Sequence, residues 1–209
     1  MTHIPYELFG ARTGNCIRVA IAFEEAGLPY TIRLVDMKQK EHQSAEFMAL
    51  NPSGKVPVMI DRSRGPEHAP LVLTQSNAIL YHLADLAPER LLGSRESRPR
   101  AHERFFFFLT DVILPSHAAF WLRTEDSANV ARRILNDRAM HAIRLAERFA
   151  SENAFLGGDT FGLADIAAVT IVHAYERELE WDALPALRRW YEAAMKRPSV
   201  ARGMRAFDD

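Results

Sequence analysis

Short apolar runs alternate with helix-periodic stretches over the first 86 residues of the chain. The runs have the length and the branched and aromatic content of strands, and they lie at residues 4–10, 30–35, 56–60 and 71–73. Between them, apolar residues recur at helical spacing over residues 15–26, 44–50 and 75–86. The predicted order is strand, helix, strand, helix, strand, strand, helix. The short connection between the last two strands favours an antiparallel hairpin.

The pattern changes after this first part. Residues 87–99 contain two prolines, a glycine and many charges, which predicts a linker. Beyond it we find only helical periodicity, over residues 100–124, 128–151, 163–179, 183–196 and 199–207. The chain is therefore predicted to fold as α/β plus all-α, with an α/β domain at residues 1–86, a linker at 87–99 and an all-helical domain at 100–209.

Composition narrows the class of protein. The 209 residues are 48% hydrophobic and 25% charged, with a formal net charge of −1, so no basic excess favours nucleic acid or an anionic membrane as a partner. No apolar run approaches the roughly 20 residues of a membrane span, and the N-terminus lacks the regions of a signal peptide. We expect a cytoplasmic enzyme or binding protein. The lone cysteine, Cys16, and the scattered histidines predict neither a disulfide within the chain nor a metal site.

The stretch from Asn51 to Leu80 carries the clearest functional signal. Thr74-Gln75-Ser76-Asn77 stands where a helix is predicted to begin, and such a start offers an amide, a hydroxyl and free backbone N–H groups to an anion. Lys55-Val56-Pro57 lies one strand earlier. Together they predict a small anionic, peptide-like ligand. The alternatives are that Thr74 or Ser76 only caps its own helix and that Pro57 is an ordinary trans proline at a strand start.

Four motifs in order resemble those of the cytosolic glutathione transferases, with theta-like and nu-like bacterial features, over the whole chain. They are Arg12-Thr13-Gly14-Asn15-Cys16-Ile17-Arg18-Val19, Asn51-Pro52…Lys55-Val56-Pro57, Gln75-Ser76-Asn77-Ala78-Ile79-Leu80 and Phe161-Gly162-Leu163-Ala164-Asp165-Ile166-Ala167. The resemblance implies a thioredoxin-like N-terminal βαβαββα domain and an all-helical C-terminal domain. It also implies glutathione as co-substrate, and a homodimer in which the N-terminal domain of one chain meets the first two long helices of the other.

The resemblance also implies which residues hold glutathione. The backbone of Val56, before a cis bond to Pro57, would pair with the cysteine part of glutathione. Gln75 and Ser76 would bind its γ-glutamyl part at the helix start. His42 and Lys55 would meet the glycine carboxylate, although a lone histidine or lysine is more often only solvated.

Thr13 stands where the family places the hydroxyl that activates the thiol. Lowering a thiol pKa by about two units takes about 2.7 kcal/mol, and one hydrogen bond to a charged partner contributes about 1.5–3 kcal/mol, so a single hydroxyl suffices. Asn15 could donate a second hydrogen bond. The alternative is that Thr13 or Asn15 merely caps the first helix. Cys16 and Tyr6 are weaker candidates: Cys16 falls further into the helix, and Leu8 rather than Tyr6 occupies the position of the family's tyrosine.

The second substrate, a small electrophile or a disulfide, is expected between Phe9, Gly10 and Ala11 on one side and His117 and Trp121 of the first long helix on the other. Conjugation of glutathione is the first hypothesis. The alternatives are glutathione-dependent disulfide or peroxide reduction, favoured by the Thr-x-Asn pattern, and a non-catalytic binding or regulatory protein. Isomerisation of the maleylacetoacetate type is disfavoured because Thr13-Gly14-Asn15 replaces the Ser-Ser-Cys-like signature.

Gly162 stands at the start of a helix that is predicted to be buried. Most family members carry serine or threonine at this position. Because glycine is an acceptable N-cap, we expect the change to cost only a few tenths of a kcal/mol. Asp165 is expected to bond back to the cap backbone as part of a capping box.

Overall fold

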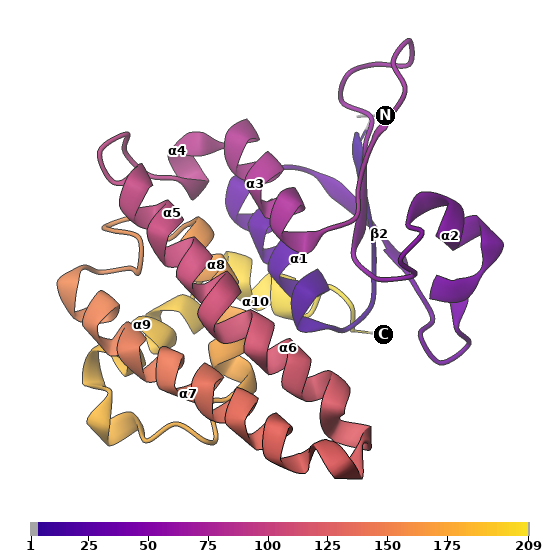
Figure 1. Cartoon of the computed structure of the whole chain (residues 1–209). Helices are drawn as coiled ribbons and strands as arrows, with labels where there is room; N and C mark the ends of the chain where they lie inside the picture. The colour runs from indigo at the N-terminus through magenta and orange to yellow at the C-terminus, as the bar shows by residue number, and fades with distance from the viewer. Residues whose placement is uncertain (1–3, 209) are drawn as a thin grey trace. The chain divides into compact units, whose positions relative to one another are not determined.

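The computed structural model describes residues 4–208 and divides into two compact units. One unit consists of residues 4–88 together with residues 197–208, and the other of residues 89–196 (Figure 1). The predicted boundaries at residues 86 and 100 remain a prediction. The packing adds a feature that they did not contain: the last described residues of the chain belong with the first unit.

The first unit is built on a four-stranded mixed sheet. Its elements are β1 (Tyr6–Gly10), α1 (Gly14–Ala26), β2 (Tyr30–Leu34), η1 (Glu41–Gln43), α2 (Ala45–Leu50), β3 (Val58–Asp61), β4 (Leu71–Leu73) and α3 (Ser76–Leu86). The strand order is β2-β1-β3-β4; β1 runs parallel to β2 and antiparallel to β3, and β3 and β4 form the expected antiparallel hairpin. The predicted βαβαββα order is confirmed.

The two faces of β1 serve different clusters, as the alternation of side chains along a strand requires. Leu8 is fully buried, and Gly10 lies against Cys16 of α1. Phe9 points to the opposite side, where it packs against a cluster formed by Val35, Phe47 of α2 and Val58.

Helix α10 (Pro198–Met204) packs along α1. The approach is close because Gly203 has no side chain: a Cβ there would lie 2.7 Å from the backbone nitrogen of Ile21. Arg202 of α10 pairs with Glu24 at 2.5 Å, and Ser199 donates to Glu25. A glycine contact and complementary charges therefore attach the end of the chain to the first unit.

A partly buried hydrogen bond between a histidine and a carboxylate joins α3 to the sheet. His82 Nε2 lies 2.9 Å from Asp61 Oδ2, and the Asp61 carboxylate also accepts the backbone N–H of Ser63 at 2.7 Å. Burial raises the pKa of Asp61, but the hydrogen bonds from Ser63 and His82 outweigh it, and the net shift is downward. A carboxyl with a lowered pKa stabilises the fold above its ordinary pKa and loses that contribution as the pH falls below it.

The second unit is all-helical among its described residues. Its elements are α4 (Pro88–Leu91), α5 (Arg98–Phe107), the π-helical segment η2 (Phe108–Ile113), α6 (Leu114–Trp121), η3 (Leu122–Thr124), η4 (Asp126–Ala128), α7 (Asn129–Glu152), α8 (Leu163–Ala174), η5 (Trp181–Ala183) and α9 (Pro185–Met195). The π-helical segment falls where Pro115, which has no N–H, cannot bond to the carbonyl of Asp111.

One prediction of local structure in this unit is wrong, and the stretch predicted as a linker contains the short helix α4, in which Pro88 takes the first position. The helix predicted over residues 163–179 ends at Ala174. Beyond it the N–H groups of Tyr175 and Glu176 bond three residues back, to Val172 and His173, and the indole N–H of Trp181 donates to the carbonyl of Glu176 at 2.9 Å.

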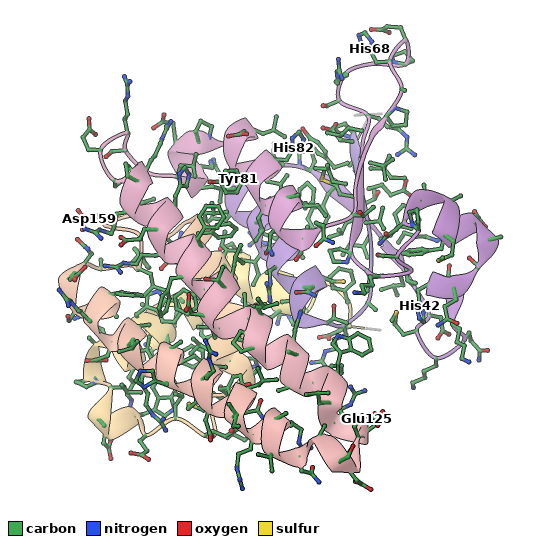
Figure 2. The ribbon with its side chains drawn as sticks, in the orientation of Figure 1. His42, His68, Tyr81, His82, Glu125 and Asp159 are labelled. Carbon is green, nitrogen blue, oxygen red and sulfur yellow. The ribbon has the colours of Figure 1, made fainter. Side chains whose placement is uncertain are left out.

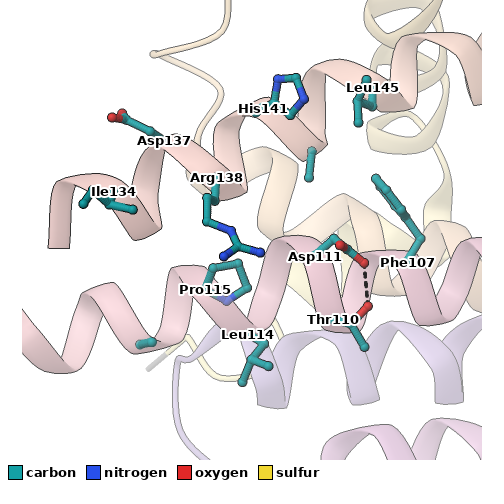
Figure 3. A pocket seen from close by; sticks show the side chains of 12 residues that line it. Phe107, Thr110, Asp111, Leu114, Pro115, Ile134, Asp137, Arg138, His141 and Leu145 are labelled. Carbon is teal, nitrogen blue, oxygen red and sulfur yellow. Dashed lines mark hydrogen bonds between the residues drawn. The ribbon is translucent and has the colours of Figure 1, made fainter. Parts of the chain in front are cut away.

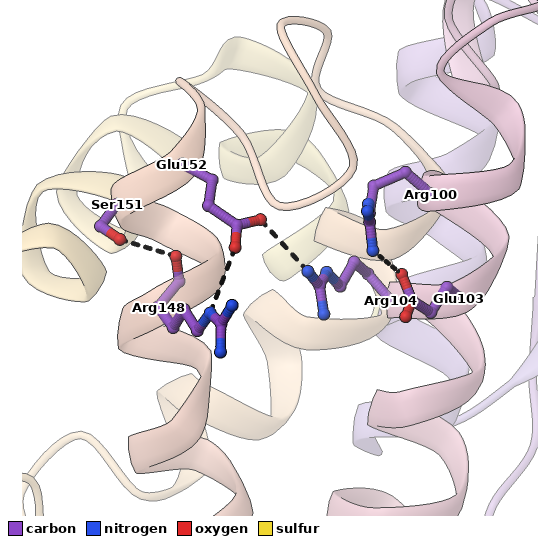
Figure 4. A network of polar contacts seen from close by, with 6 residues as sticks. All are labelled: Arg100, Glu103, Arg104, Arg148, Ser151 and Glu152. Atoms are coloured by element: carbon purple, nitrogen blue, oxygen red, sulfur yellow. Dashed lines mark hydrogen bonds and ion pairs between the residues drawn. The ribbon is translucent and has the colours of Figure 1, made fainter.

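The stretch Arg98–Thr124 is long and apolar enough to cross a membrane by length and composition alone, which qualifies the expectation that no run would be. Its elements pack within the helical unit, α5 against α8 and α6 against α7. Arg104, 8% exposed, pairs with Glu152 at 3.2 Å and lies over the ring of Phe149, so α5 is joined to the end of α7 (Figure 4). Only 33% of its most apolar window is buried, so these contacts cover part of the stretch.

Asp165 organises the start of the buried helix α8. Its Oδ2 accepts the backbone N–H of Gly162 at 3.0 Å, as expected for a capping box, and its Oδ1 accepts the backbone N–H of Leu156 at 2.8 Å and the indole N–H of Trp190 at 2.7 Å. One buried carboxylate thus ties together a loop, a helix start and α9.

Gly162 is required by a close approach that the sequence did not reveal. A Cβ at this position would lie 2.4 Å from the backbone carbonyl oxygen of Leu91. On sequence alone, glycine is expected to be slightly less stabilising than serine at this position, but the structure indicates the opposite. A serine here would gain a cap but collide with rigid backbone.

We predict that Gly162→Ser lowers stability by about 1–3 kcal/mol, the usual cost of overpacking, although it restores the capping residue of the family. Gly162→Ala should cost about as much, whereas Gly14→Ala, whose Cβ would meet only Arg18 at 3.9 Å, should cost little. Urea unfolding of the three variants measures the difference. A Gly162→Ser protein at least as stable as the parent would contradict the prediction.

Candidate functional site

Thr13 caps helix α1 and also contacts a thiol. Its hydroxyl oxygen accepts the backbone N–H of Cys16 at 3.3 Å, and the same hydroxyl donates to Cys16 Sγ at 3.1 Å. Thr13 therefore does cap α1, but the cap uses only the hydroxyl oxygen as an acceptor. The proton of Thr13 is directed at a sulfur atom. Asn15 lies half-buried in the first turn, and no side-chain hydrogen bond of Asn15 occurs within residues 4–208.

The other two candidate activating groups are poorly suited to the task. Cys16 is fully buried, and burial raises the pKa of its thiol against the lowering effect of the Thr13 hydrogen bond. Burial likewise raises the pKa of Tyr6. Both groups are therefore neutral at physiological pH, and neither presents a nucleophile or an anion.

A buried asparagine shapes the loop that carries Lys55 and Val56. Asn51 is 2% exposed; its amide donates to the carbonyl of Lys55 at 2.5 Å, and its oxygen accepts from the backbone and hydroxyl of Ser53. The Val56–Pro57 peptide bond is cis, as the resemblance implied. Within the described part of the chain, the Val56 backbone makes no hydrogen bond and the ammonium group of Lys55 makes no ion pair.

The N-terminus of α3 is left without a side-chain cap. Gln75 occupies the N-cap position with an extended backbone and makes no capping hydrogen bond, and the helix begins at Ser76. The first backbone bond of the helix runs from the N–H of Ile79 to the carbonyl of Gln75. Over residues 4–208, the hydroxyl of Ser76 has no hydrogen-bond partner and the N–H groups of the first turn are unpaired. The capping alternative for Ser76 thus fails here.

His42 lies in η1, beside α2 (Figure 2). Its backbone carbonyl is 3.2 Å from the point where a side chain on Gly54 would begin, so the His42 segment contacts the loop that precedes Lys55. Its Nδ1 atom is buried and has no hydrogen-bond partner in residues 4–208. His42 and the Lys55 loop are thus adjacent in the first unit, as their predicted joint role requires.

The residues expected to line the electrophile site fall in both units. Phe9, Gly10 and Ala11 end β1 and begin the loop to α1. His117 and Trp121 lie four residues apart on α6, so they share one face of that helix; Trp121 is 64% exposed. Their common role in one site remains a prediction.

A separate groove of about 570 Å³ lies in the helical unit between α6 and α7 (Figure 3). Leu114, Pro115, Ile134 and Leu145 give it apolar walls, and Arg138 points into it. Neither His117 nor Trp121 lines this groove, so it does not belong to the predicted electrophile site.

Family models match both parts of the chain. The model described as glutathione S-transferase, N-terminal domain, matches residues 4–85, and the one described as glutathione S-transferase, C-terminal domain, matches residues 119–198. The chain belongs to the cytosolic glutathione transferase superfamily. The predicted fold class, a thioredoxin-like domain followed by a helical one, is thereby confirmed.

Similar proteins extend over nearly the whole of this glutathione transferase family member. It is 28% identical to the disulfide-bond oxidoreductase YfcG of Escherichia coli, over 95% of this chain and 94% of that protein. Maleylacetoacetate isomerase of Pseudomonas aeruginosa is 30% identical over 90% of each chain. A solved glutathione transferase from Burkholderia graminis, with two glutathione molecules bound per subunit, is 26% identical with a TM-score of 0.83, covering 100% of this chain and 91% of that one.

Sequence reasoning missed two residues of the first unit. The motif that contains Asn51 does not show that its side chain holds the Lys55 loop. The pattern of α1 does not show that Arg18 is only 2% exposed. The available signal was a charge inside an otherwise apolar helix stripe, between Ile17 and Val19.

Proposed function

We propose that this protein is a glutathione transferase that binds glutathione on its thioredoxin-like unit and activates the thiol through Thr13. The observation that carries the proposal is the uncapped start of α3, where the hydroxyl of Ser76 and the first-turn N–H groups are free within residues 4–208. Ser76 is only 7% exposed, but unpaired donors at the positive end of a helix suit the γ-glutamyl carboxylate. Gln75 adds an amide beside them.

The rest of the proposed glutathione site follows from the neighbouring loop. Asn51 holds the loop so that the Val56 backbone, which leads into the cis bond to Pro57, stays available to pair with the cysteine part of glutathione. Lys55 and His42 would meet the glycine carboxylate at the other end of the tripeptide.

To activate the glutathione thiol, the Thr13 hydroxyl needs only to rotate so that its proton points at the glutathione sulfur. In the structure this proton is donated to the neutral thiol of Cys16. A thiolate is a stronger acceptor than a buried neutral thiol, because hydrogen bonds to ionised partners are about twice as strong as neutral ones. We therefore propose that the Thr13 hydroxyl turns to the glutathione sulfur on binding, while its oxygen continues to cap α1. Asn15 in the first turn would donate a second hydrogen bond.

Ser76→Ala tests the glutathione site. Loss of one hydrogen bond to a charged group costs about 1.5–3 kcal/mol, but the backbone N–H groups remain, so we expect Kd for glutathione to rise about tenfold. Titration calorimetry measures Kd. Ser127→Ala, an exposed serine in the helical unit, is the matched control and should bind like the parent. An unchanged Kd in Ser76→Ala would contradict the assigned contact.

Glutathione-dependent disulfide reduction is the second candidate function. The Thr13-x-Asn15 pattern and the similarity to a disulfide-bond oxidoreductase favour it. Parallel assays with a chloronitrobenzene and with a mixed disulfide separate the two activities: the proposal expects turnover of the electrophile. Turnover of the disulfide alone would establish the alternative. Neither activity, together with no rise in melting temperature on adding glutathione, would favour a regulatory protein.

We further propose a cytoplasmic homodimer, as the family resemblance implies. The groove between α6 and α7 and the exposed Leu114, Ile134 and Leu145 offer an apolar surface on the first two long helices, the surface predicted to meet the partner. Light scattering at micromolar concentration checks this, and a mass near the 23.7 kDa of one chain would contradict it.

A further inference from the structure

Arg18 is a buried charge without a counter-charge. Its side chain is 2% exposed, and its Nε donates to the carbonyl of Gly14 at 3.2 Å. Its Nη1 is buried and makes no hydrogen bond within residues 4–208, and no carboxylate in that range lies within 4.0 Å of the guanidinium. A buried ion that is not paired costs several kcal/mol, so the fold carries an unbalanced positive charge at this point.

The charge lies at the wrong end of its own helix for stability. The guanidinium turns back toward the start of α1, where its Nη2 is 3.9 Å from the point at which a Gly14 side chain would begin. A helix N-terminus already carries a partial positive charge, so a cation there is repelled. The guanidinium and the partial positive charge of the helix N-terminus repel each other in the free protein, and both would stabilise a bound anion.

The charged groups of the elements packed against α1 do not neutralise Arg18. Helices α3 and α10 both contact α1. Arg202 of α10 pairs with Glu24, His82 of α3 lies against Asp61, and Glu25 at the far end of α1 pairs with Arg197. Asp85 of α3 is exposed and does not lie within 4.0 Å of the Arg18 guanidinium. Asp208, which follows α10, pairs with Arg12 at 3.0 Å.

The charge of Arg18 and the Thr13 hydrogen bond act in the same direction on the Cys16 thiol. Burial is the largest influence on the Cys16 thiol and raises its pKa, while the Thr13 hydrogen bond and the charge of Arg18 lower it. Cys16 Sγ and the position proposed for the glutathione sulfur share one hydrogen-bond donor, the Thr13 hydroxyl. Arg18 Nε donates to the carbonyl of Gly14, the residue directly after Thr13, so the guanidinium lies at the same turn as the hydroxyl proposed to hold the thiolate.

We propose that Arg18 is a positioning residue for thiol activation, whose buried charge holds the sulfur of bound glutathione in the thiolate form. The inference rests on the proposed function. On binding, the thiol proton leaves to solvent, and the sulfur anion is stabilised by the Thr13 hydroxyl, the first turn of α1 and Arg18. The cost of burying Arg18 unpaired in the free protein is offset when this anion forms.

The test is a pH titration of the ultraviolet absorbance of the thiolate of glutathione bound to the full-length protein. An opposite charge nearby lowers a pKa by about 1–3 units, so Arg18→Met should raise the apparent pKa of the bound thiol by about one unit or more. Arg18→Lys, which keeps the charge, should restore most of the shift. Arg202→Met removes an exposed arginine of α10 and should leave the pKa unchanged.

Stability separates this role from a structural one. Because Arg18 is unpaired, an apolar replacement of similar size should leave the melting temperature equal or higher. If the methionine variant does not fold, Arg18→Gln, which is neutral and keeps a donor for the Gly14 carbonyl, gives the same comparison. A neutral variant whose bound thiol has the parent's pKa would overturn the inference alone. A parent protein that binds no glutathione, or binds it only as the thiol, would overturn the proposed function and this inference with it.

Discussion

Thr13→Ala is expected to lower kcat/KM for glutathione conjugation by about 10- to 100-fold while Kd for glutathione changes little. The reason is that the hydroxyl is proposed to stabilise the thiolate by one charge-assisted hydrogen bond, worth about 1.5–3 kcal/mol, whereas the tripeptide is held by the Lys55 loop and the start of α3. Steady-state kinetics and calorimetry measure the two quantities. Equal losses in both would contradict the role assigned to Thr13.

The same substitution removes the cap of α1, because Thr13 also accepts the N–H of Cys16. That loss costs about 1 kcal/mol of stability, or roughly 2–4 °C in melting temperature, and leaves the protein folded at the assay temperature. Thr13→Ser keeps the hydroxyl and the cap and should retain most activity. The defect of the alanine variant should be largest at low pH and shrink as the pH rises toward the ordinary thiol pKa near 8.5, where the thiolate forms without help.

Asp165→Ala is expected to have the largest effect on stability. It deprives three buried donors, on Leu156, Gly162 and Trp190, of their common acceptor. Leaving buried donors unsatisfied costs about 1–3 kcal/mol each, and because the losses are not additive we expect about 3–5 kcal/mol in total. Denaturant unfolding measures the loss, which corresponds to a fall of roughly 10 °C in melting temperature. A loss below about 1 kcal/mol would contradict the prediction.

Asp165→Asn is the matched control. Its amide oxygen can still accept from Leu156 and Trp190, which both bond to Oδ1, so only the Gly162 contact is lost and the cost should be clearly smaller. Burial raises the pKa of Asp165 to about 6, against four hydrogen bonds that lower it. A raised pKa in the folded state means that this group's contribution is fully present below its ordinary pKa and is lost as the pH rises through about 6. The advantage of the parent over the asparagine variant should therefore be larger at about pH 4.5 than at about pH 7.5.

Local pattern predicted the elements well because each depends on neighbours in the chain. Strand β4 lies where expected, and α1, α2 and α3 begin within one residue of their predicted starts. The miss after α8 is also local in origin. Beyond Ala174 the N–H groups of Tyr175, Glu176 and Glu178 each bond three residues back, and the hydrophobic pattern does not distinguish such turns from a continuing α-helix.

The candidate glutathione site was found in part. The motifs located Thr13 and Ser76, but they left open whether each hydroxyl merely capped a helix. The structure gives different answers: Thr13 does cap α1, with its proton on Cys16, while Ser76 caps nothing among the described residues. Two side chains on similar helix starts thus differ in a way that depends on exact backbone geometry, which no pattern of residue types contains.

The sequence by itself determined the order of helices and strands in the first unit, the family, and the places in the chain where chemistry is expected, because periodicity and motifs are properties of near neighbours. Only the tertiary structure decided which residues far apart in the chain meet. Gly162 is constrained by the carbonyl of Leu91, Gly203 by the backbone of Ile21, and Arg18 by a surrounding that buries it without a counter-charge. Burial and close approach depend on all the neighbours in space at once, so one residue can be a cap, a steric requirement or an unpaired charge while its local sequence looks the same.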